Sequence, residues 1–432
     1  MKKIVMTCMV CCMAFAVLFA AGGKEEGKEK KKNVELSLMI PQGSWRDVYT
    51  DMAAAIKEDT GYSVEFQVIP DDQFYPLMQT KLATGEVPDI IKHNIPTNNT
   101  ELNANNTMVD LTNEPWASRL VNPNLLKDPQ SGKIFALPIE SSSFFGGIYY
   151  NKKVFKELGI SEKQPATWEE FLNVLRKIKK SGKGIIPVAS SEKDSWTTQV
   201  FTTLGFPVAV AKKPEVWNKL LINKLKWSDV PEFKMILDRY NMIFKEGLVN
   251  SDNLSFTYDM AKEAVATGKA AMMMNGEWVV VDMMAKWPGV EIGYWNIPFT
   301  DSYDIIATGS YVGGFFVPKK GNAQEAVKFL NIWSQPKYQN MYFAAHPGFP
   351  GLNGVDGGKV PECVQHVVDT YIKTGKYVYE MNAMVNVASP ILPELWKYYV
   401  EMSAGIKTPA EVLKAWDTLY SDYMKSRKEP GF

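Results

Sequence analysis

The sequence predicts an α/β protein whose sheets are mainly parallel and doubly wound. Two observations predict this class: short apolar strands alternate with helical stretches from residue 34 onwards, and a glycine (Gly61, Gly85) ends each of the first two helices. The chain has 432 residues, 46% hydrophobic and 22% charged, which suffices for a large core divided into several domains or lobes.

The first five elements follow one another in the order β-α-β-α-β. The predicted strands are Val34–Ile40, Tyr62–Ile69 and one opening at Pro88–Ile91, and the predicted helices are Arg46–Asp59 and Asp72–Thr84. Ligands of such sheets bind beyond the carboxyl ends of the strands. Those ends are Pro41–Arg46, Pro70–Gln73 and Lys92–Asn98.

The alternation of strands and helices continues to the end of the chain, without an internal repeat. One helix, Thr167–Ser181, begins with a capping box formed by Thr167 and Glu170. The other predicted strands are Gly146–Asn151, Ile185–Val188 and Ala270–Met274. The other predicted helices are Asp229–Gly247, Tyr258–Thr267, Ala323–Trp333, Pro336–Ala345, Ile391–Met402 and Pro409–Lys428.

Residues 1–20 have the features of a secretory signal peptide. Two cationic residues, Lys2 and Lys3, precede an apolar run up to Phe19 that is short for a membrane span, and small residues follow it. We expect cleavage after Ala20, with an uncleaved membrane anchor as the alternative.

Residues 21–33 contain almost only Gly, Lys and Glu, and we expect a disordered tether there. Cys8, Cys11 and Cys12 lie inside the apolar run and fit a lipoprotein cleavage box poorly, so attachment through a lipid stays open. After cleavage only Cys363 remains, and an internal disulfide is excluded. We expect an exported, periplasmic protein, tethered to the membrane if it is lipidated.

Composition excludes several classes of function. Lys and Arg number 48 and so do Asp and Glu, without the basic excess that nucleic-acid binding requires. Only three His are present, which argues against a multi-histidine metal site, and we expect no metal and no cofactor. The 12 Trp residues all lie at or beyond Trp45, and this aromatic richness suits a ligand with flat apolar faces.

Three stretches carry a resemblance to a known family. Residues 149–188 contain YYNKKVFKELG and TWEEF, residues 262–280 read KEAVATGKAAMMMNGEWVV, and residues 309–350 begin GSYVGGFFVPKKGNAQEAVKFLNIW. In this order and spacing they resemble the extracellular solute-binding proteins of ABC importers, family 1, which includes the maltodextrin-binding proteins. The resemblance extends from residue 34 to the end of the chain.

The resemblance implies a two-lobe, type II periplasmic-binding-protein fold with a hinge. Lobe one would comprise residues 34–141 with 306–348, and lobe two residues 142–305 with 349–432. It also implies a monomer without enzymatic activity. Such a protein captures a monosaccharide or oligosaccharide between the lobes, closes on it and delivers it to a membrane permease.

A sugar site needs flat aromatic faces and a few polar groups for the hydroxyls. Trp45 and Arg46 are candidates because they follow the first strand at its carboxyl end. Exposure at the start of a helix is the alternative for the arginine.

The resemblance adds six candidates. Trp278 would stack on a sugar, with Glu277 in the same turn accepting hydroxyls. His93 stands where maltodextrin-binding proteins have an aromatic platform, which argues against maltodextrin as the ligand. The remaining candidates are Glu140 at the first crossover, Trp196 in lobe two and Trp396 near the C-terminal helices.

Two other functions stay open. The same fold could bind a non-sugar solute such as a polyamine, a phosphoester or a metal ion. An exported glycan-processing enzyme would need two carboxylates about 5–10 Å apart across a sugar, and Glu140 and Glu277 are the candidates for that pair.

Overall fold

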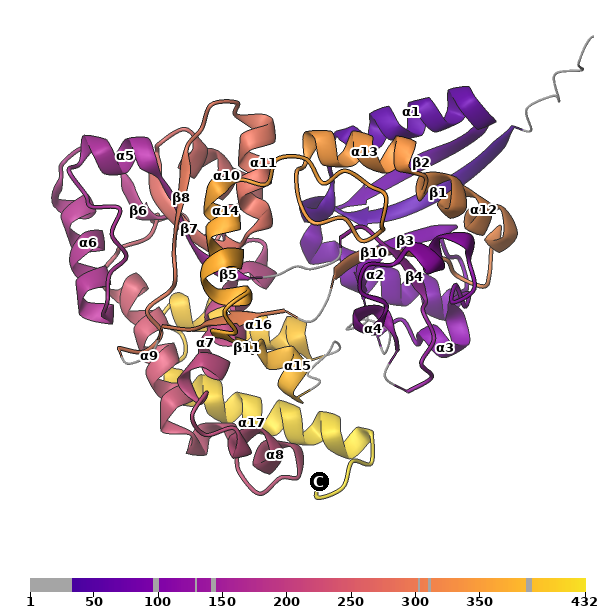
Figure 1. Ribbon diagram of the computed structural model, residues 1–432. Helices are drawn as coiled ribbons and strands as arrows, with labels where there is room; N and C mark the ends of the chain where they lie inside the picture. The colour runs from indigo at the N-terminus through magenta and orange to yellow at the C-terminus, as the bar shows by residue number, and fades with distance from the viewer. Residues whose placement is uncertain are drawn as a thin grey trace, which may run out of the picture.

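The computed structural model describes two lobes that lie side by side (Figure 1). The indigo N-terminal elements and the orange α12 and α13 form one lobe, and the magenta, salmon and yellow elements form the other. None of the helices in the described ranges is long and apolar enough to cross a membrane. Those ranges are 33–95, 101–128, 130–140, 145–301, 304–309, 312–385 and 391–432. The predicted signal peptide, and the predicted tether up to residue 32, lie outside them.

Lobe one is built on a five-stranded sheet in the order β2-β1-β3-β10-β4. The first three strands are parallel, as their sequence order predicted, whereas β10 is antiparallel to both its neighbours. A Cβ atom on Gly314 would lie 2.2 Å from Cδ1 of Ile95, so glycine lets β10 pack beside β3. The strands are β1 (Val34–Pro41), β2 (Tyr62–Ile69), β3 (Ile90–Ile95), β4 (Ala136–Pro138) and β10 (Val312–Phe316).

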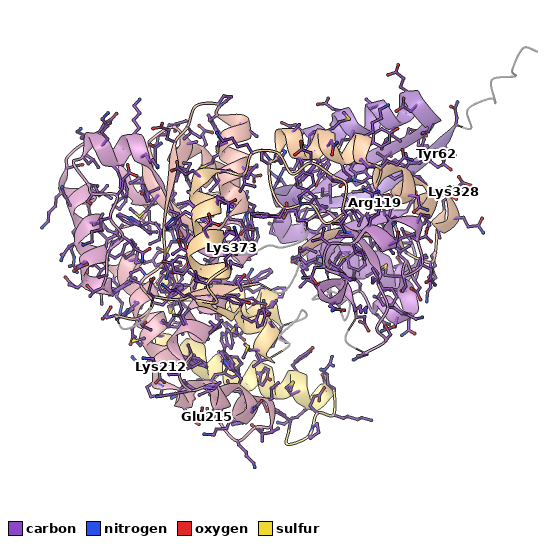
Figure 2. The ribbon with its side chains drawn as sticks, in the orientation of Figure 1. Tyr62, Arg119, Lys212, Glu215, Lys328 and Lys373 are labelled. Carbon is purple, nitrogen blue, oxygen red and sulfur yellow. The ribbon has the colours of Figure 1, made fainter. Side chains whose placement is uncertain are left out.

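Aromatic side chains pack the helices of lobe one against this sheet. Tyr49 of α1 stacks on Tyr342 of α13 at 5.6 Å and lies 5.8 Å from Trp333 of α12. On the far edge of the sheet, Tyr62 donates a 2.6 Å hydrogen bond to Glu325 of α12 (Figure 2). The helices are α1 (Val48–Thr60), α2 (Asp71–Thr84), α3 (Ala104–Thr107), α4 (Pro123–Leu126), α12 (Ala323–Trp333) and α13 (Pro336–Ala345).

Lobe two contains a four-stranded sheet in the order β6-β7-β5-β8 and a separate β11-β9 pair. The β6–β7 and β9–β11 pairs are parallel, and β5 is antiparallel to both its neighbours. Both main sheets are therefore mixed, since β10 runs against its neighbours in lobe one and β5 runs against its neighbours in lobe two. The strands are β5 (Gly146–Asn151), β6 (Ile186–Val188), β7 (Ala270–Gly276), β8 (Ile292–Trp295), β9 (Ile306–Thr308) and β11 (Tyr377–Tyr379).

Helices surround the sheet of lobe two, and the C-terminal helices complete its core. Half of the capping box predicted for α6 is present: the Thr167 hydroxyl accepts the N–H of Glu170 at 3.2 Å, whereas Glu170 Oε2 accepts the N–H of Ala166 at 2.7 Å rather than that of Thr167. The helices are α5 (Lys152–Glu157), α6 (Trp168–Lys180), α7 (Val200–Ala209), α8 (Glu215–Leu221), α9 (Pro231–Lys245), α10 (Tyr258–Ala266), α11 (Trp278–Lys286), α14 (Glu362–Val367), α15 (Met381–Val385), α16 (Leu392–Ser403) and α17 (Pro409–Ser426).

The strand pairing bears on where the chain crosses between the lobes. We expected residues 306–348 in lobe one, yet β9 pairs with β11, and Phe145 forms a bridge with Thr308. Leu352, expected in lobe two, packs in the lobe-one core and bridges Leu120. Arg119, which Figure 2 labels, donates hydrogen bonds to the carbonyls of Asn353, in the same segment, and of Ser334, at the end of α12. The bounds expected near residues 306 and 348 therefore differ from the pairing by a few residues.

Candidate functional site

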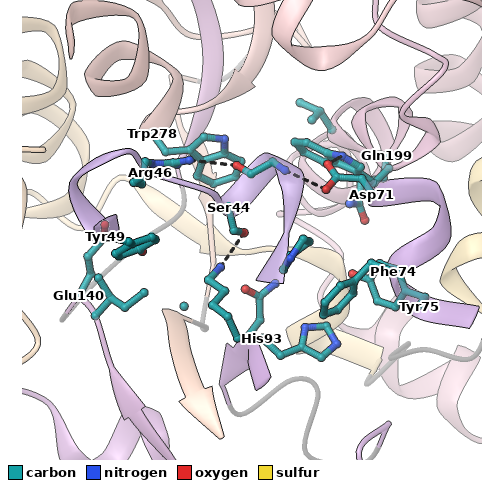
Figure 3. Close-up of a pocket in the computed structure, with 18 of the residues that line it drawn as sticks. Ser44, Arg46, Tyr49, Asp71, Phe74, Tyr75, His93, Glu140, Gln199 and Trp278 are labelled. Atoms are coloured by element: carbon teal, nitrogen blue, oxygen red, sulfur yellow. Dashed lines mark hydrogen bonds between the residues drawn. The ribbon is translucent and has the colours of Figure 1, made fainter. Parts of the chain in front are cut away.

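A pocket of about 200 Å³ lies where the two lobes meet (Figure 3). Lobe one contributes the loop after β1, the start of α2 and the end of β3, which are the three strand ends expected to bind ligands. Lobe two contributes the 3₁₀ turn η4 (Ser195–Gln199), the start of α7 and the start of α11. The pocket thus takes residues from both lobes.

Five of the eight candidate residues line this pocket and three do not. Those that line it are Arg46, His93, Glu140, Trp196 and Trp278. Those that do not are Trp45, Glu277 and Trp396.

Trp278 presents its ring to the pocket from the first turn of α11 (Figure 3). A Cβ atom on Gly276 would lie 2.2 Å from Cζ3 of this ring, so the missing side chain at Gly276 leaves the space that the ring occupies. The end of β7 and the start of α11 together fix this aromatic face at the pocket wall.

Trp196 lines the pocket and also joins the lobes. Its indole Nε1–H donates a 2.8 Å hydrogen bond to Asp71 Oδ2, and its ring meets Tyr258 edge-on at 5.1 Å. Asp71 Oδ1 accepts the backbone N–H of Gly43 at 2.8 Å. Burial raises the pKa of Asp71, and these two hydrogen bonds act in the opposite direction.

Charged groups of both signs enclose the lobe-one side of the pocket. The Lys92 ammonium donates to the Ser44 hydroxyl at 2.8 Å, and burial, with Arg46 nearby, lowers the pKa of Lys92 to about 8. Burial raises the pKa of Glu140 to about 7, although Arg46 and Lys92 pull it down. Since Arg46 lies 2.9 Å from Asp282, the cations of the pocket have carboxylates near them.

His93 is held by a carboxylate and by aromatic rings. Its Nε2 lies 3.2 Å from Glu101 Oε2, and its ring meets Phe74 at 5.6 Å and Tyr75 at 5.4 Å. Tyr75 itself meets Trp396 edge-on at 5.7 Å. His93 is therefore a pocket residue with a fixed orientation, supported by a buried acid.

The three candidates outside the pocket have other contacts that explain their positions. Trp45 packs edge-on against Phe66 at 5.0 Å and donates its indole N–H to Asp47. Glu277 is buried in lobe two, where its Oε2 accepts the Phe145 N–H at 2.9 Å. Trp396 lies in the lobe-two core and meets the ring of Tyr75, which does line the pocket.

Several pocket residues escaped the sequence analysis. Asp71 and Lys92 lie at strand ends that were identified as ligand-binding edges, so their signal was present but was not assigned to single residues. Gln199 and Thr203 follow Trp196 at the start of α7, and Tyr342 comes from α13, far along the chain. Nothing in the local sequence marks these last three residues, because only the tertiary fold brings them to the pocket.

The pocket offers hydrogen-bonding groups and aromatic faces rather than a metal-binding set. Across the part of the chain that the structure describes, no cluster of three or more His, Cys, Asp or Glu side chains could hold a metal ion. The two carboxylates proposed for a glycan-processing enzyme do not both line the pocket, since Glu277 is occupied by the backbone N–H of Phe145.

Three buried glutamates of lobe two make stability depend on pH. Burial raises the pKa of Glu192 to about 7 and the pKa values of Glu277 and Glu380 to about 8, from 4.5. At pH values between 4.5 and these raised pKa values, the folded protein binds more protons at the three glutamates than the unfolded chain does. The free energy of unfolding therefore falls as pH rises. The expected slope is up to about 1.4 kcal/mol per pH unit for each group.

The measurement is the melting temperature between pH 6.5 and 8, which should fall steadily. In this window His346 and Lys92, with pKa values lowered to about 4 and about 8, contribute smaller slopes of the opposite sign, because the unfolded chain binds more protons at these two groups than the folded protein does. The variant Glu277→Gln removes one titrating carboxyl and should flatten the slope. A melting temperature that rises across the window would contradict the prediction.

Comparison with known proteins identifies the class to which this fold and pocket belong. A model of the family described as bacterial extracellular solute-binding protein matches residues 42–340, well over half of the chain. The chain belongs to this family of exported binding proteins, as its sequence predicted.

Two curated relatives are similar to the chain over much of its length. The multiple sugar-binding protein of Streptococcus mutans is 27% identical over 307 residues, which are 69% of this chain and 70% of the relative. The melibiose/raffinose/stachyose-binding protein of Bacillus subtilis is 27% identical over 281 residues, 62% of each chain.

A solved structure supports the architecture. A sugar transporter of Bacillus licheniformis in complex with stachyose superposes with a TM-score of 0.71 at 20% identity, covering 88% of this chain and 97% of that chain. The likeness confirms the predicted two-lobe fold.

Proposed function

We propose that the protein is the solute-binding component of an ABC importer and captures a monosaccharide or oligosaccharide in the pocket between its lobes. The observation that carries this proposal is the lining of the pocket, in which aromatic rings from both lobes surround hydrogen-bonding side chains. Sugar rings present C–H groups on their faces and hydroxyls on their edges, and this lining matches both. The sugar-binding relatives support the same conclusion.

Trp278 and Trp196 are the proposed stacking residues. Asp71, Glu140 and His93 are the proposed partners for hydroxyl groups, with Lys92 as a further donor. Because the cations of the pocket have carboxylates near them, the pocket suits an uncharged ligand better than a polyamine or a phosphoester. The cavity of about 200 Å³ is small for a ligand pocket, which favours a short sugar.

The mechanism is binding without chemistry. A sugar that contacts both lobes favours the closed arrangement by the difference between its affinities for the two arrangements. The closed protein then delivers the sugar to the permease. We further propose that residues 21–33 tether the folded part near the membrane, and that the crossovers between lobes lie near residues 140, 310 and 355.

The experiment is a thermal-shift screen of residues 33–432 against a panel of neutral sugars. The panel includes galactose, melibiose, raffinose, stachyose and xylobiose, with spermidine, glycerol 3-phosphate and zinc chloride as the alternative ligands. A ligand at about a thousand times its Kd stabilises a protein by about 4 kcal/mol, which moves the melting temperature by several degrees. We expect a shift with a neutral sugar and a Kd near the micromolar range, about −8 kcal/mol.

A shift with spermidine or glycerol 3-phosphate alone would overturn the sugar assignment while leaving the family unchanged. Release of a coloured product from nitrophenyl glycosides would overturn the proposal that the protein only binds. Mass spectrometry of the denatured protein shows whether a ligand already occupies the pocket. If no compound shifts the melting temperature, this result distinguishes a pocket that is already filled from a sugar that the panel lacks.

A further inference from the structure

A buried ion pair joins the two lobes beside the pocket. Nε of Arg46, in the loop after β1, lies 2.9 Å from Oδ1 of Asp282 on α11, and the side chains are 12% and 6% exposed. Asp282 does not line the pocket, whereas Arg46 does. The contact is made by protein groups alone and needs no atom of a solute.

Each partner of this ion pair is anchored within its own lobe. Nη1 of Arg46 donates to the carbonyl oxygens of Gly43 at 3.1 Å and Trp45 at 2.7 Å, which fixes the guanidinium to the loop of lobe one. Oδ2 of Asp282 accepts a 3.2 Å hydrogen bond from Lys262 of α10. Both charged groups therefore keep partners within their own lobe if the lobes separate, and only the ion pair between Arg46 and Asp282 is lost.

A second contact between the lobes lies close by, between the loop after β1 and α10. Gln42 Nε2 donates to Asp259 Oδ2 at 3.3 Å, and Asp259 is itself 3.0 Å from the Lys262 ammonium. This ammonium lies 4.2 Å from the centre of the Tyr258 ring. Lys262 thus holds the carboxylates that meet the loop of lobe one.

We propose that Asp282 is a positioning residue that holds the lobes together through Arg46 and so favours the closed arrangement without touching the solute. The pair is preorganised on both sides, so forming it costs little side-chain entropy. An ion pair that is buried across an interface is sensitive to loss of one partner. Any effect of this ion pair on sugar affinity rests on the proposed function. Its effect on the distance between the lobes does not.

The experiment measures the distance between the lobes in the absence of any sugar. Cys363 is replaced by serine, and spin labels are placed at the exposed sites Ala54 on α1 and Ala285 on α11. Double electron–electron resonance then reports the populations of near and separated lobes in unmodified, Asp282→Asn, Arg46→Gln and doubly substituted proteins.

We expect a near population in the unmodified protein and at least about a fivefold fall in the ratio of near to separated lobes in Asp282→Asn. Arg46→Gln should give the same fall, and the double variant should lose no more than either single variant. Asp238→Asn is the matched control, because Asp238 pairs with Lys234 inside α9 at 2.7 Å and should leave the distances unchanged.

Three results would overturn the proposal. They are a single separated population in the unmodified protein, unchanged distances in Asp282→Asn, and effects of the two substitutions that simply add. A purely structural role would lower the melting temperature of Asp282→Asn without changing the distances, and that result counts against it too. Since no sugar is present, failure here is distinguishable from failure of the proposed function.

Discussion

Replacing Trp278 by alanine is expected to weaken sugar binding by about 2–4 kcal/mol, or about 30- to 700-fold in Kd. The ring forms part of the pocket wall at the start of α11, and it fills the space above Gly276. Its removal takes away an apolar face on which a sugar ring would stack, and the alanine cannot replace that area. Isothermal titration with the sugar that gives the largest thermal shift measures the change.

Trp287→Ala is the matched control for this prediction. Trp287 directly follows the same helix and does not line the pocket. The control should bind the sugar with the affinity of the unmodified protein. Equal losses in the two variants would show that any tryptophan removed near α11 weakens binding through the fold, and would contradict a direct stacking role for Trp278.

Replacing Trp227 by alanine is expected to destabilise lobe two by about 3–5 kcal/mol. Trp227 is 1% exposed and lies among aromatic rings, with centroids 4.5 Å from Trp416 and 5.6 Å from Phe233. Alanine leaves a cavity that these large rings cannot close without leaving their preferred rotamers. Urea unfolding followed by circular dichroism measures the change.

Two comparisons make the Trp227 prediction specific. Trp227→Phe keeps a ring in the cluster and should lose much less stability than the alanine variant. The folded fraction of Trp227→Ala should still bind sugar normally, because this residue does not line the pocket. A decrease of less than about 1 kcal/mol in the free energy of unfolding would contradict the prediction. It would show that the neighbouring side chains move into the space that Trp227 leaves.

Local sequence signals predicted the elements whose ends are marked by breaking residues. The strand Tyr62–Ile69 was predicted to the residue, because Gly61 precedes it and Pro70 follows it. The helices Ala323–Trp333 and Pro336–Ala345 were also predicted with the observed bounds. Helical periodicity and breaking residues act over a few positions, so they can be read without knowing the fold.

Two helices at the pocket had no such signal. Every residue of α7 (Val200–Ala209) is buried, and Gly205 and Pro207 interrupt it, so no polar face alternates with an apolar one. The first turns of α11 (Trp278–Lys286) gave no clear helical pattern either, because the helix begins with an almost continuous apolar run. A buried helix and a buried strand are alike in periodicity, and packing alone distinguishes them.

Some residues of the candidate site could likewise be predicted from the sequence, and others could not. The strand-end rule led to the segments that carry Arg46, Asp71 and Lys92, because the carboxyl ends of parallel strands share one edge. The rule could not choose between Trp45 and Arg46, which are neighbours in sequence. Trp45 packs against Phe66 within its lobe, whereas Arg46 reaches across to lobe two.

Local chemistry in the chain thus suffices for the class of fold, the order of the early elements and the three strand ends that line the pocket. The tertiary structure alone decides that β10 enters the first sheet antiparallel and that Glu277 is buried against Phe145. It also alone brings Asp71 to Trp196 and Arg46 to Asp282 across the lobes. The physical reason is that these contacts join residues more than a hundred positions apart, where neither periodicity nor turn chemistry carries information.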